Sequence, residues 1–237
     1  MNYQRKVKHT PSIFFNIEKD KLFRPAVIFL AALHFFGLLG MHLPIMNEYL
    51  QLLTHFESFI SLTPLNLLLT AGMLLLFHKT WNKYFLIFLL ASMLIGFFAE
   101  VLGVATGLVF GEYQYGATLG WKVLEVPLAI GLNWFLLSYF CSSLLHKVSS
   151  NIWIKTIAAA FLMVLLDMLI EPVAMQYDFW NWAGNVIPFQ NYVAWFFIAL
   201  FPCFLFYRLP FEKSNPFAKY VFGAQLLFFL FNNLLLF

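Results

Sequence analysis

The sequence has 237 residues, of which 62% are hydrophobic and only 11% are charged, and its mean hydropathy is +0.80. A soluble globular domain does not have this composition, so the chain is predicted to lie in a membrane. The net charge of +3 reflects where the basic residues lie along the chain and does not indicate a nucleic-acid partner.

Seven apolar runs have the length of a membrane-spanning helix, about 18 residues or more. They lie at 24–42, 58–77, 84–106, 122–145, 152–172, 188–207 and 217–237. The predicted fold class is therefore all-α, a polytopic membrane protein built as a bundle of about seven transmembrane helices. We expect one integral membrane domain over 1–237, beginning with a polar segment at 1–23. This segment lacks the small-residue cleavage site of a secretory signal, so the first helix is expected to be an uncleaved anchor.

The basic residues are distributed very unevenly over the predicted connections. Thirteen of the 14 Lys and Arg residues precede the first helix or lie between helices two and three, four and five, or six and seven. Only Lys122 falls on the other side. The positive-inside rule then places the N-terminus in the cytoplasm and the C-terminus outside. We expect a multi-pass protein of the inner, cytoplasmic membrane.

The histidines do not form the closely spaced clusters that a membrane iron hydroxylase would need. The six are His9, His34, His42, His55, His78 and His146. From this spacing we predict no metal site and no cofactor.

Glu100 lies in the third predicted helix, on one face with three glycines. These are Gly96, Gly103 and Gly107. Small residues at this spacing let another helix approach closely, so Glu100 is expected to face protein rather than lipid.

The loop after this helix is rich in glycine and aromatic residues, and it includes Tyr113 and Tyr115. Such a loop can be an interfacial aromatic belt with a flexible turn, or it can be a lid over a pocket. The sequence leaves both interpretations open.

The fourth predicted helix carries Glu125 near its start. Lys122 is three residues earlier, so a simple ion pair is one interpretation of Glu125. Asn133 is eight residues beyond Glu125 and is expected on the same face, deeper in the membrane. The alternative is that Glu125 and Asn133 both belong to a site.

The fifth predicted helix contains Asp167 and Glu171, two acids inside an apolar run. Acids are costly there and indicate a functional site by default. Four residues apart, they share a helix face. Two like charges in a low dielectric cannot easily both ionise, so at least one is expected to be a neutral acid, which can donate a proton. The alternative is that both acids only hydrogen-bond a neighbouring helix.

Polar and aromatic residues follow this helix at its outer end. Trp180 and Trp182 flank Asn181 in a cluster suited to the membrane interface, and Asn191 and Trp195 begin the sixth helix. The predicted orientation places them on the same side as six of the 11 acids, from Glu100 to Asp178. The chain is therefore expected to form an acidic, aromatic-rimmed site near one membrane face.

No nucleophile elbow, phosphate-binding glycine loop or dinucleotide fingerprint occurs in the sequence, nor an aspartate-rich diphosphate-metal motif. The residues match proton transfer to an apolar substrate, with aromatic faces stabilising a cation.

Four segments carry a resemblance to a known family. They contain EVLGVATGLVFGEYQY (96–115), LGWKVLEVPL (119–128), DMLIEPVA (167–174) and WNW with NVIPFQNYVAW (180–195). Over roughly residues 90 to 200 the chain resembles the membrane-integral carotenoid biosynthesis family that includes the CruF-type carotenoid 1',2'-hydratases. The resemblance implies addition of water to the terminal double bond of a linear ψ end group, as in lycopene, γ-carotene or bacterioruberin precursors, to give a tertiary alcohol.

The expected roles combine this reaction with the residues. Asp167 or Glu171 is expected to donate the proton, and Glu100 or Glu125 to act as the base that orients water. The remaining candidate residues are expected to surround the substrate. They are Tyr113, Tyr115, Asn133, Trp180, Trp182, Asn191 and Trp195.

The expected partners are an apolar carotenoid, the lipid bilayer and other enzymes of the carotenoid pathway. Two other functions stay open. A carotenoid end-group cyclase or isomerase would protonate the same alkene without adding water. A proton-coupled transporter also uses intramembrane acids, although it usually has repeated halves that this sequence lacks.

Overall fold

A computed structural model describes residues 19–54 and 56–236 of the chain. Most of the predicted polar segment at 1–23 therefore lies outside the described residues. Within them, seven helical segments are long and apolar enough to cross a membrane. The prediction of an all-α polytopic membrane protein is confirmed.

The membrane-spanning helices follow the predicted apolar runs closely. They are α1 (Lys19–His42), α3 (Thr63–Leu76, preceded by the 3-10 turn η1, Phe59–Leu62), α4 (Lys83–Thr106), α5 (Leu128–Leu145), α6 (Ile152–Gln176), α7 (Phe189–Arg208) and α8 (Ala218–Leu236). A short amphipathic helix, α2 (Pro44–Leu53), lies between α1 and η1. The sequence did not predict it separately.

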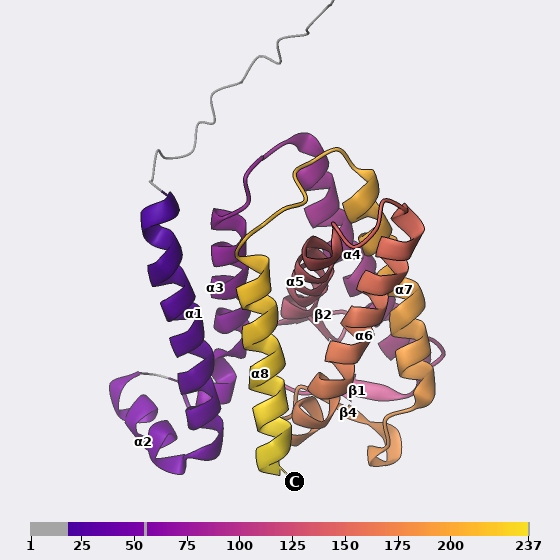
Figure 1. Cartoon of the computed structure of the whole chain (residues 1–237). Coiled ribbons are helices and arrows are strands. Elements are labelled where there is room, and N and C mark those ends of the chain that lie inside the picture. The colour runs from indigo at the N-terminus through magenta and orange to yellow at the C-terminus, as the bar shows by residue number, and fades with distance from the viewer. Residues whose placement is uncertain (1–18, 55, 237) are drawn as a thin grey trace, which may run out of the picture.

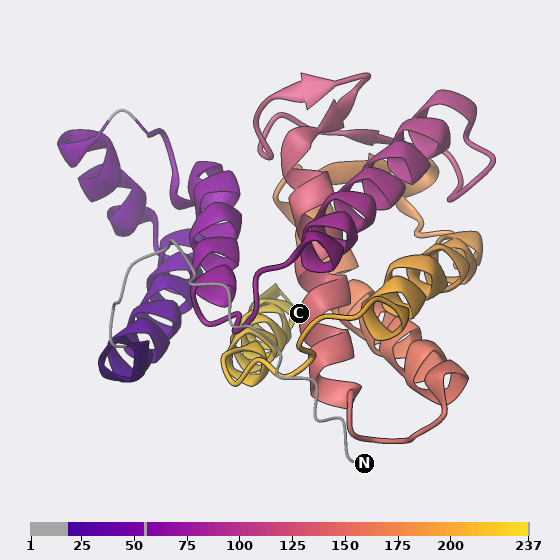
Figure 2. The same cartoon turned by 90° about the horizontal axis from the view of Figure 1, so that it is seen from above.

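Helix α5 lies at the centre of the bundle (Figures 1 and 2). It packs against α3, α4, α6, α7 and α8, and it is the most buried of the seven spans. Seen from above, α1, α2 and α3 lie on one side of α5 and α8, while α4, α6 and α7 lie on the other. The side chains of α5 can therefore reach both halves of the bundle.

The start of α5 differs from the prediction of a helix from residue 122. Residues Lys122–Val123 form strand β2 and Val126–Pro127 form β3, which pair as a hairpin. Its two turn residues, Leu124 and Glu125, have φ of 52° and 64°, as the mirror-image hairpin turns require. Pro127 is the residue directly before α5, with an extended backbone (φ −62°, ψ 137°).

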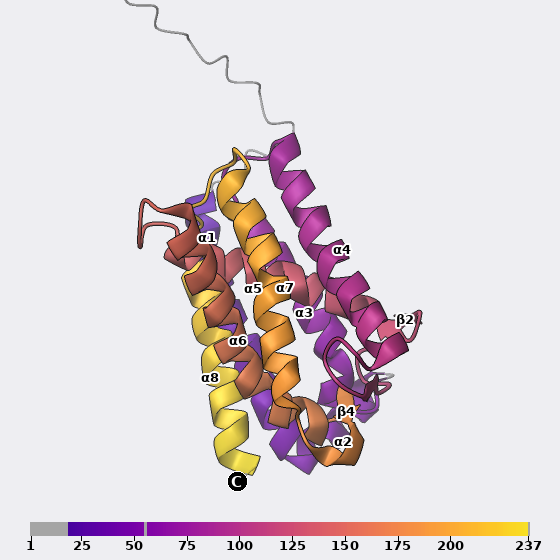
Figure 3. The same ribbon diagram turned by 90° about the vertical axis from the view of Figure 1, so that its right-hand side faces the viewer.

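A second strand pair closes the end of the bundle where the C-terminus lies (Figure 3). Strand β1 (Tyr113–Tyr115) follows α4, and β4 (Trp180–Trp182) follows α6. They pair antiparallel, with Tyr113 opposite Trp182 and Tyr115 opposite Trp180. Side chains two residues apart on a strand point to the same face, so the two tyrosines share one face and the two tryptophans share one face. The short 3-10 turn η2 (Ala183–Asn185) follows β4 and leads toward α7.

Candidate active site

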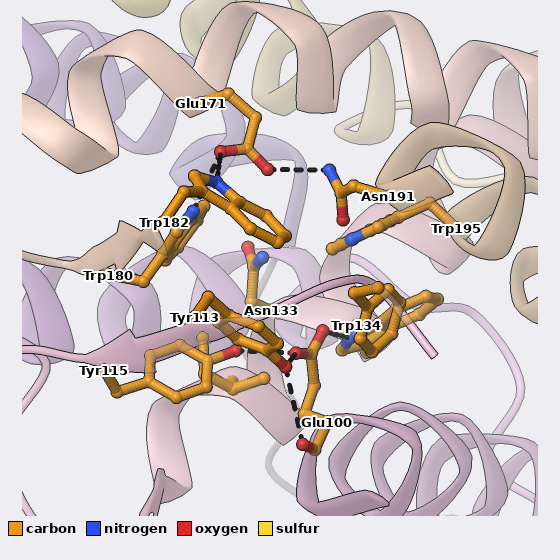
Figure 4. Close-up of a pocket in the computed structure, with 12 residues that line it drawn as sticks. Glu100, Tyr113, Tyr115, Asn133, Trp134, Glu171, Trp180, Trp182, Asn191 and Trp195 are labelled. Carbon is orange, nitrogen blue, oxygen red and sulfur yellow. Dashed lines mark hydrogen bonds between the residues drawn. The ribbon is translucent and has the colours of Figure 1, made fainter. Parts of the chain in front are cut away.

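A cavity of about 20 Å³ lies beneath the β1–β4 strand pair, enclosed by α4, α5, α6 and α7. Figure 4 shows two glutamates on its opposite walls, Glu100 from α4 and Glu171 from α6. Both are buried, with 3% and 1% of their surface exposed. The two acids come from helices about 70 residues apart in sequence, and the bundle brings them to one space.

Glu100 accepts three hydrogen bonds from aromatic side chains. Its Oε2 accepts from the hydroxyls of Tyr113 at 2.6 Å and Tyr115 at 2.8 Å. Its Oε1 accepts from the indole Nε1 of Trp134 at 3.2 Å. Two of the three donors are thus hydroxyl groups.

Two glycines on the same face of α4 make room for these donors. A Cβ atom at Gly96 would overlap the ring of Trp134, and one at Gly103 would overlap Phe110 and approach the Tyr113 hydroxyl. The predicted close approach is confirmed at Gly96, where the neighbour is α5. At Gly103 the neighbour is the loop after α4 rather than another helix.

Glu171 also accepts three hydrogen bonds, but all of them come from nitrogen. Its Oε2 accepts from the indoles of Trp180 at 2.9 Å and Trp182 at 2.8 Å. Its Oε1 accepts from the side-chain nitrogen of Asn191 at 2.8 Å. The tryptophans, expected at the membrane interface, are instead buried with their N–H groups directed at this acid.

Asp167 lies behind Glu171, one turn earlier on α6. The same nitrogen of Asn191 donates to its Oδ2 at 3.2 Å. Asp167 is 1% exposed and accepts no other hydrogen bond from the described residues. It does not line the cavity, so its contact with the site runs through Asn191.

Aromatic rings form most of the remaining wall. Trp134 stacks on Trp195, with ring centroids 4.1 Å apart, and Tyr113 lies 4.9 Å from Trp182. Asn133 lies between the two glutamate clusters in Figure 4. Such a wall can stabilise a cation by its ring faces while it excludes bulk water.

The two tyrosine hydroxyls lie outside the membrane-spanning segments. Burial raises the pKa of both Tyr113 and Tyr115 above the ordinary value of 10. Both therefore keep their protons at neutral pH.

Of the four predicted catalytic acids, only Glu125 neither lines the cavity nor hydrogen-bonds a described residue that does. It lies exposed in the turn of the β2–β3 hairpin. The prediction that it shares a helix face with Asn133 is wrong because α5 begins only at Leu128. The ion pair with Lys122 is not formed either, since the Lys122 ammonium group donates to the carbonyl oxygen of Tyr115.

Sequence reasoning missed three residues that line the cavity: Phe110, Ile130 and Trp134. Trp134 follows Asn133 directly, but no local pattern indicated that it would meet Gly96 and Glu100 on another helix. Among the described residues, no group of three or more His, Cys, Asp or Glu side chains is arranged to hold a metal ion.

Comparison with known proteins adds to this geometry. Over 115 residues the chain is 29% identical to the bisanhydrobacterioruberin hydratase of Haloarcula japonica, covering 45% of this chain and 39% of that protein. No solved structure matches the chain. The family model described as carotenoid biosynthesis protein matches residues 62–236. Since this match includes most of the sequence, the chain belongs to the carotenoid biosynthesis protein family.

Proposed function

We propose that the protein hydrates the terminal double bond of a linear carotenoid ψ end group to a tertiary alcohol by acid catalysis. The observation that carries this proposal is the pair of buried glutamates facing each other across an aromatic cavity. Water does not add to an isolated alkene without protonation, and a buried carboxylic acid is a suitable proton donor. The hydratase activity named for the Haloarcula japonica relative supports the same reaction.

The hydrogen bonds favour Glu100 as the proton donor. A carboxylate offers about four lone-pair positions, and each glutamate has three of them occupied. The donors of Glu171 are N–H groups, which can only donate and therefore favour its anion. The hydroxyls of Tyr113 and Tyr115 can also accept, so Glu100 can hold a proton or release it without losing its partners.

The reaction then proceeds in two steps. The Glu100 proton bonds to the CH carbon of the double bond, and the dimethyl carbon becomes a tertiary cation beside the aromatic rings. The oxygen of a water molecule bonds to this carbon and loses a proton to Glu171. The product carries both the proton and the hydroxyl, and proton transfer from Glu171 back to Glu100 restores the enzyme. This order reverses the roles expected from the sequence, where the donor was placed on the helix of Glu171.

Asp167 has a positioning role in this proposal. Asp167 accepts one hydrogen bond, whereas Glu100 and Glu171 each accept three, so its anion is the least stabilised of the three. We therefore propose that Asp167 holds a proton beside the Glu171 carboxylate. Because it does not line the cavity, it acts on the reaction only through Asn191 and Glu171.

The cavity of about 20 Å³ has room for about one water molecule, so the end group enters only when side chains move apart.

The test is conversion of lycopene in a host that makes no other end-group enzyme, carried out in ¹⁸O-labelled water without dioxygen. The expected product is a tertiary alcohol that carries the label and forms in the presence of chelators. An alcohol that forms only when dioxygen is supplied, and that carries no label from water, would make the protein a hydroxylase. A product with the mass of the substrate and a new ring would make it a cyclase.

We also propose that the acid site lies toward the outer face of the cytoplasmic membrane. Most Lys and Arg residues that the structure describes lie at the opposite end of the bundle, many of them in or next to the α3–α4, α5–α6 and α7–α8 connections. A reporter fused after Phe237 should therefore score as external, whereas a cytoplasmic reporter would reverse the assignment.

A further inference from the structure

A second cavity, of about 70 Å³, lies beside the acid cavity and is enclosed by α1, α3, α5 and α8. Ile130, Asn133 and Trp180 line both cavities, so the two share a wall. The second cavity is the larger one and contains none of the buried acids. The proposed reaction as described above does not use it.

Several polar groups in its wall have no hydrogen-bond partner among the residues that the structure describes. The Nδ1 atom of His34 lies 2.9 Å from the carbonyl oxygen of Leu30. A carbonyl can only accept, so Nδ1 carries the proton and Nε2 remains an acceptor. This Nε2 is buried without a hydrogen-bond partner among residues 19–54 and 56–236.

Two side-chain amides in the same wall are also unpaired. Neither Asn133 nor Gln225 hydrogen-bonds any residue that the structure describes. Asn66, also in the wall, accepts from Thr70 through Oδ1, and its amide nitrogen has no described partner. These groups come from α1, α3, α5 and α8, and together they offer both donors and acceptors.

Water is the occupant that fits these groups. A buried polar group without a partner costs free energy, and most such groups in proteins bind another group or an ordered water. A single water needs only about 10 to 15 Å³ of such space and two to four polar partners. The second cavity exceeds this requirement several times.

We propose that the second cavity is a water reservoir that feeds the acid cavity, and that Asn133 passes water from one to the other. This inference rests on the proposed hydration. After protonation, the tertiary cation has two fates. Either a water oxygen bonds to it and gives the alcohol, or the cation loses a proton and returns to an alkene. The supply of water therefore decides how often a protonation leads to product.

The experiment counts both fates in deuterium oxide. Each return to alkene after protonation by a deuterated acid can leave deuterium in the recovered carotenoid, so mass spectrometry gives alcohol formed per deuterium incorporated. Asn133→Leu and Gln225→Met keep approximate size and remove the amides. Each is expected to lower this ratio about tenfold or more, because a hydrogen-bonded water is lost.

Two further variants control for packing. Leu67→Met changes an apolar residue of the same cavity wall at similar volume, and it should leave the ratio at the wild-type value. Gln225→Asn keeps an amide and should recover most of the ratio that Gln225→Met loses. If Asn133→Leu and Gln225→Met accumulate normally and keep the wild-type ratio, the reservoir proposal is wrong.

An experimental structure of the wild-type protein tests the proposal without any variant. Ordered water between Asn133, Gln225 and His34 is expected, whereas a dry cavity or a lipid chain in it would overturn the proposal. A wild-type protein that forms neither alcohol nor deuterated carotenoid would refute the proposed hydration. The structure tests the water in the second cavity independently of activity. Failure of the reservoir proposal can therefore be told apart from failure of the proposed hydration.

Discussion

The two glutamates of the cavity have the same number of hydrogen-bond donors but different kinds. Each accepts two donors on one carboxyl oxygen and one on the other. Around Glu100 two donors are hydroxyls, and around Glu171 all three are N–H groups. A count of hydrogen bonds therefore does not define the role of a buried acid. What matters is whether the partner groups can change from hydrogen-bond acceptor to donor when the carboxyl loses its proton.

Both environments come from one small structural element. Strand β1 provides Tyr113 and Tyr115 to Glu100, and its partner strand β4 provides Trp180 and Trp182 to Glu171. The strand pair thus fixes the two acids relative to each other, although neither acid lies on it.

The largest expected effect is loss of the acids themselves. Glu100→Gln and Glu171→Gln should each accumulate in the membrane and lose about 10²- to 10⁴-fold in alcohol formation, because neither amide can transfer the proton. In deuterium oxide Glu171→Gln should still exchange deuterium into the carotenoid, while Glu100→Gln should not. The opposite pattern would assign the donor to Glu171.

Glu125→Gln is the matched control for these variants. This acid is exposed in a hairpin turn, so the Glu125→Gln variant should convert substrate at close to the wild-type rate. A loss as large as that of Glu100→Gln would contradict the placement of the site.

Removal of single hydrogen-bond donors should affect the two acids differently. Tyr115→Phe and Trp180→Phe each delete one hydrogen bond to a carboxyl, and we expect rate losses of about 10- to 100-fold. The tyrosine variant should lower deuterium exchange and alcohol formation together. The tryptophan variant should lower alcohol formation more than exchange, and equal losses of both would remove the distinction between the two acids.

The raised pKa of Tyr113 and Tyr115 gives this cluster a defined pH dependence. Below pH 10 both phenols are neutral in the folded and unfolded chains, so they contribute no change in stability with pH. Above pH 10 only the unfolded chain loses these protons, so stability should fall as the pH rises. Thermal unfolding of Tyr113→Phe against pH should show a smaller decrease above pH 10 than wild type.

Gly96→Ala tests the packing that holds Trp134 against Glu100. The added methyl group must displace the indole, and we expect a destabilisation of about 1 to 3 kcal/mol with a lower melting temperature. Gly72→Ala in α3 is the control, because a Cβ there meets no atom within 4 Å. It should leave the melting temperature unchanged or raise it slightly.

Among the buried acids, the smallest effect is expected at Asp167. If this carboxyl is neutral and acts through Asn191, Asp167→Asn should reduce turnover by less than about tenfold, because a neutral amide replaces a neutral acid. A loss comparable to that of Glu171→Gln, in protein that accumulates normally, would show that the Asp167 proton takes part in the reaction.

Local features of the sequence were enough to locate the spans and the buried acids. Helix length and hydropathy are local properties, so the seven spans could be located, with errors mainly at their ends. The cost of an acid in a membrane is also local, and it identified Glu100, Asp167 and Glu171 without knowledge of their neighbours. Helical periodicity likewise predicted that Gly96 would leave room for a neighbouring helix.

Which residues come into contact depends on the folded bundle. Trp134 on α5 donates a hydrogen bond to Glu100 on α4, and the β1–β4 pairing joins segments about 65 residues apart. The same pairing turned Trp180 and Trp182 from the expected membrane interface into the cavity, and a two-residue turn left Glu125 outside it. These outcomes depend on contacts between distant segments, and hydropathy and periodicity carry no information about such contacts. For the same reason, only the folded bundle brings His34, Asn133 and Gln225 to one cavity wall.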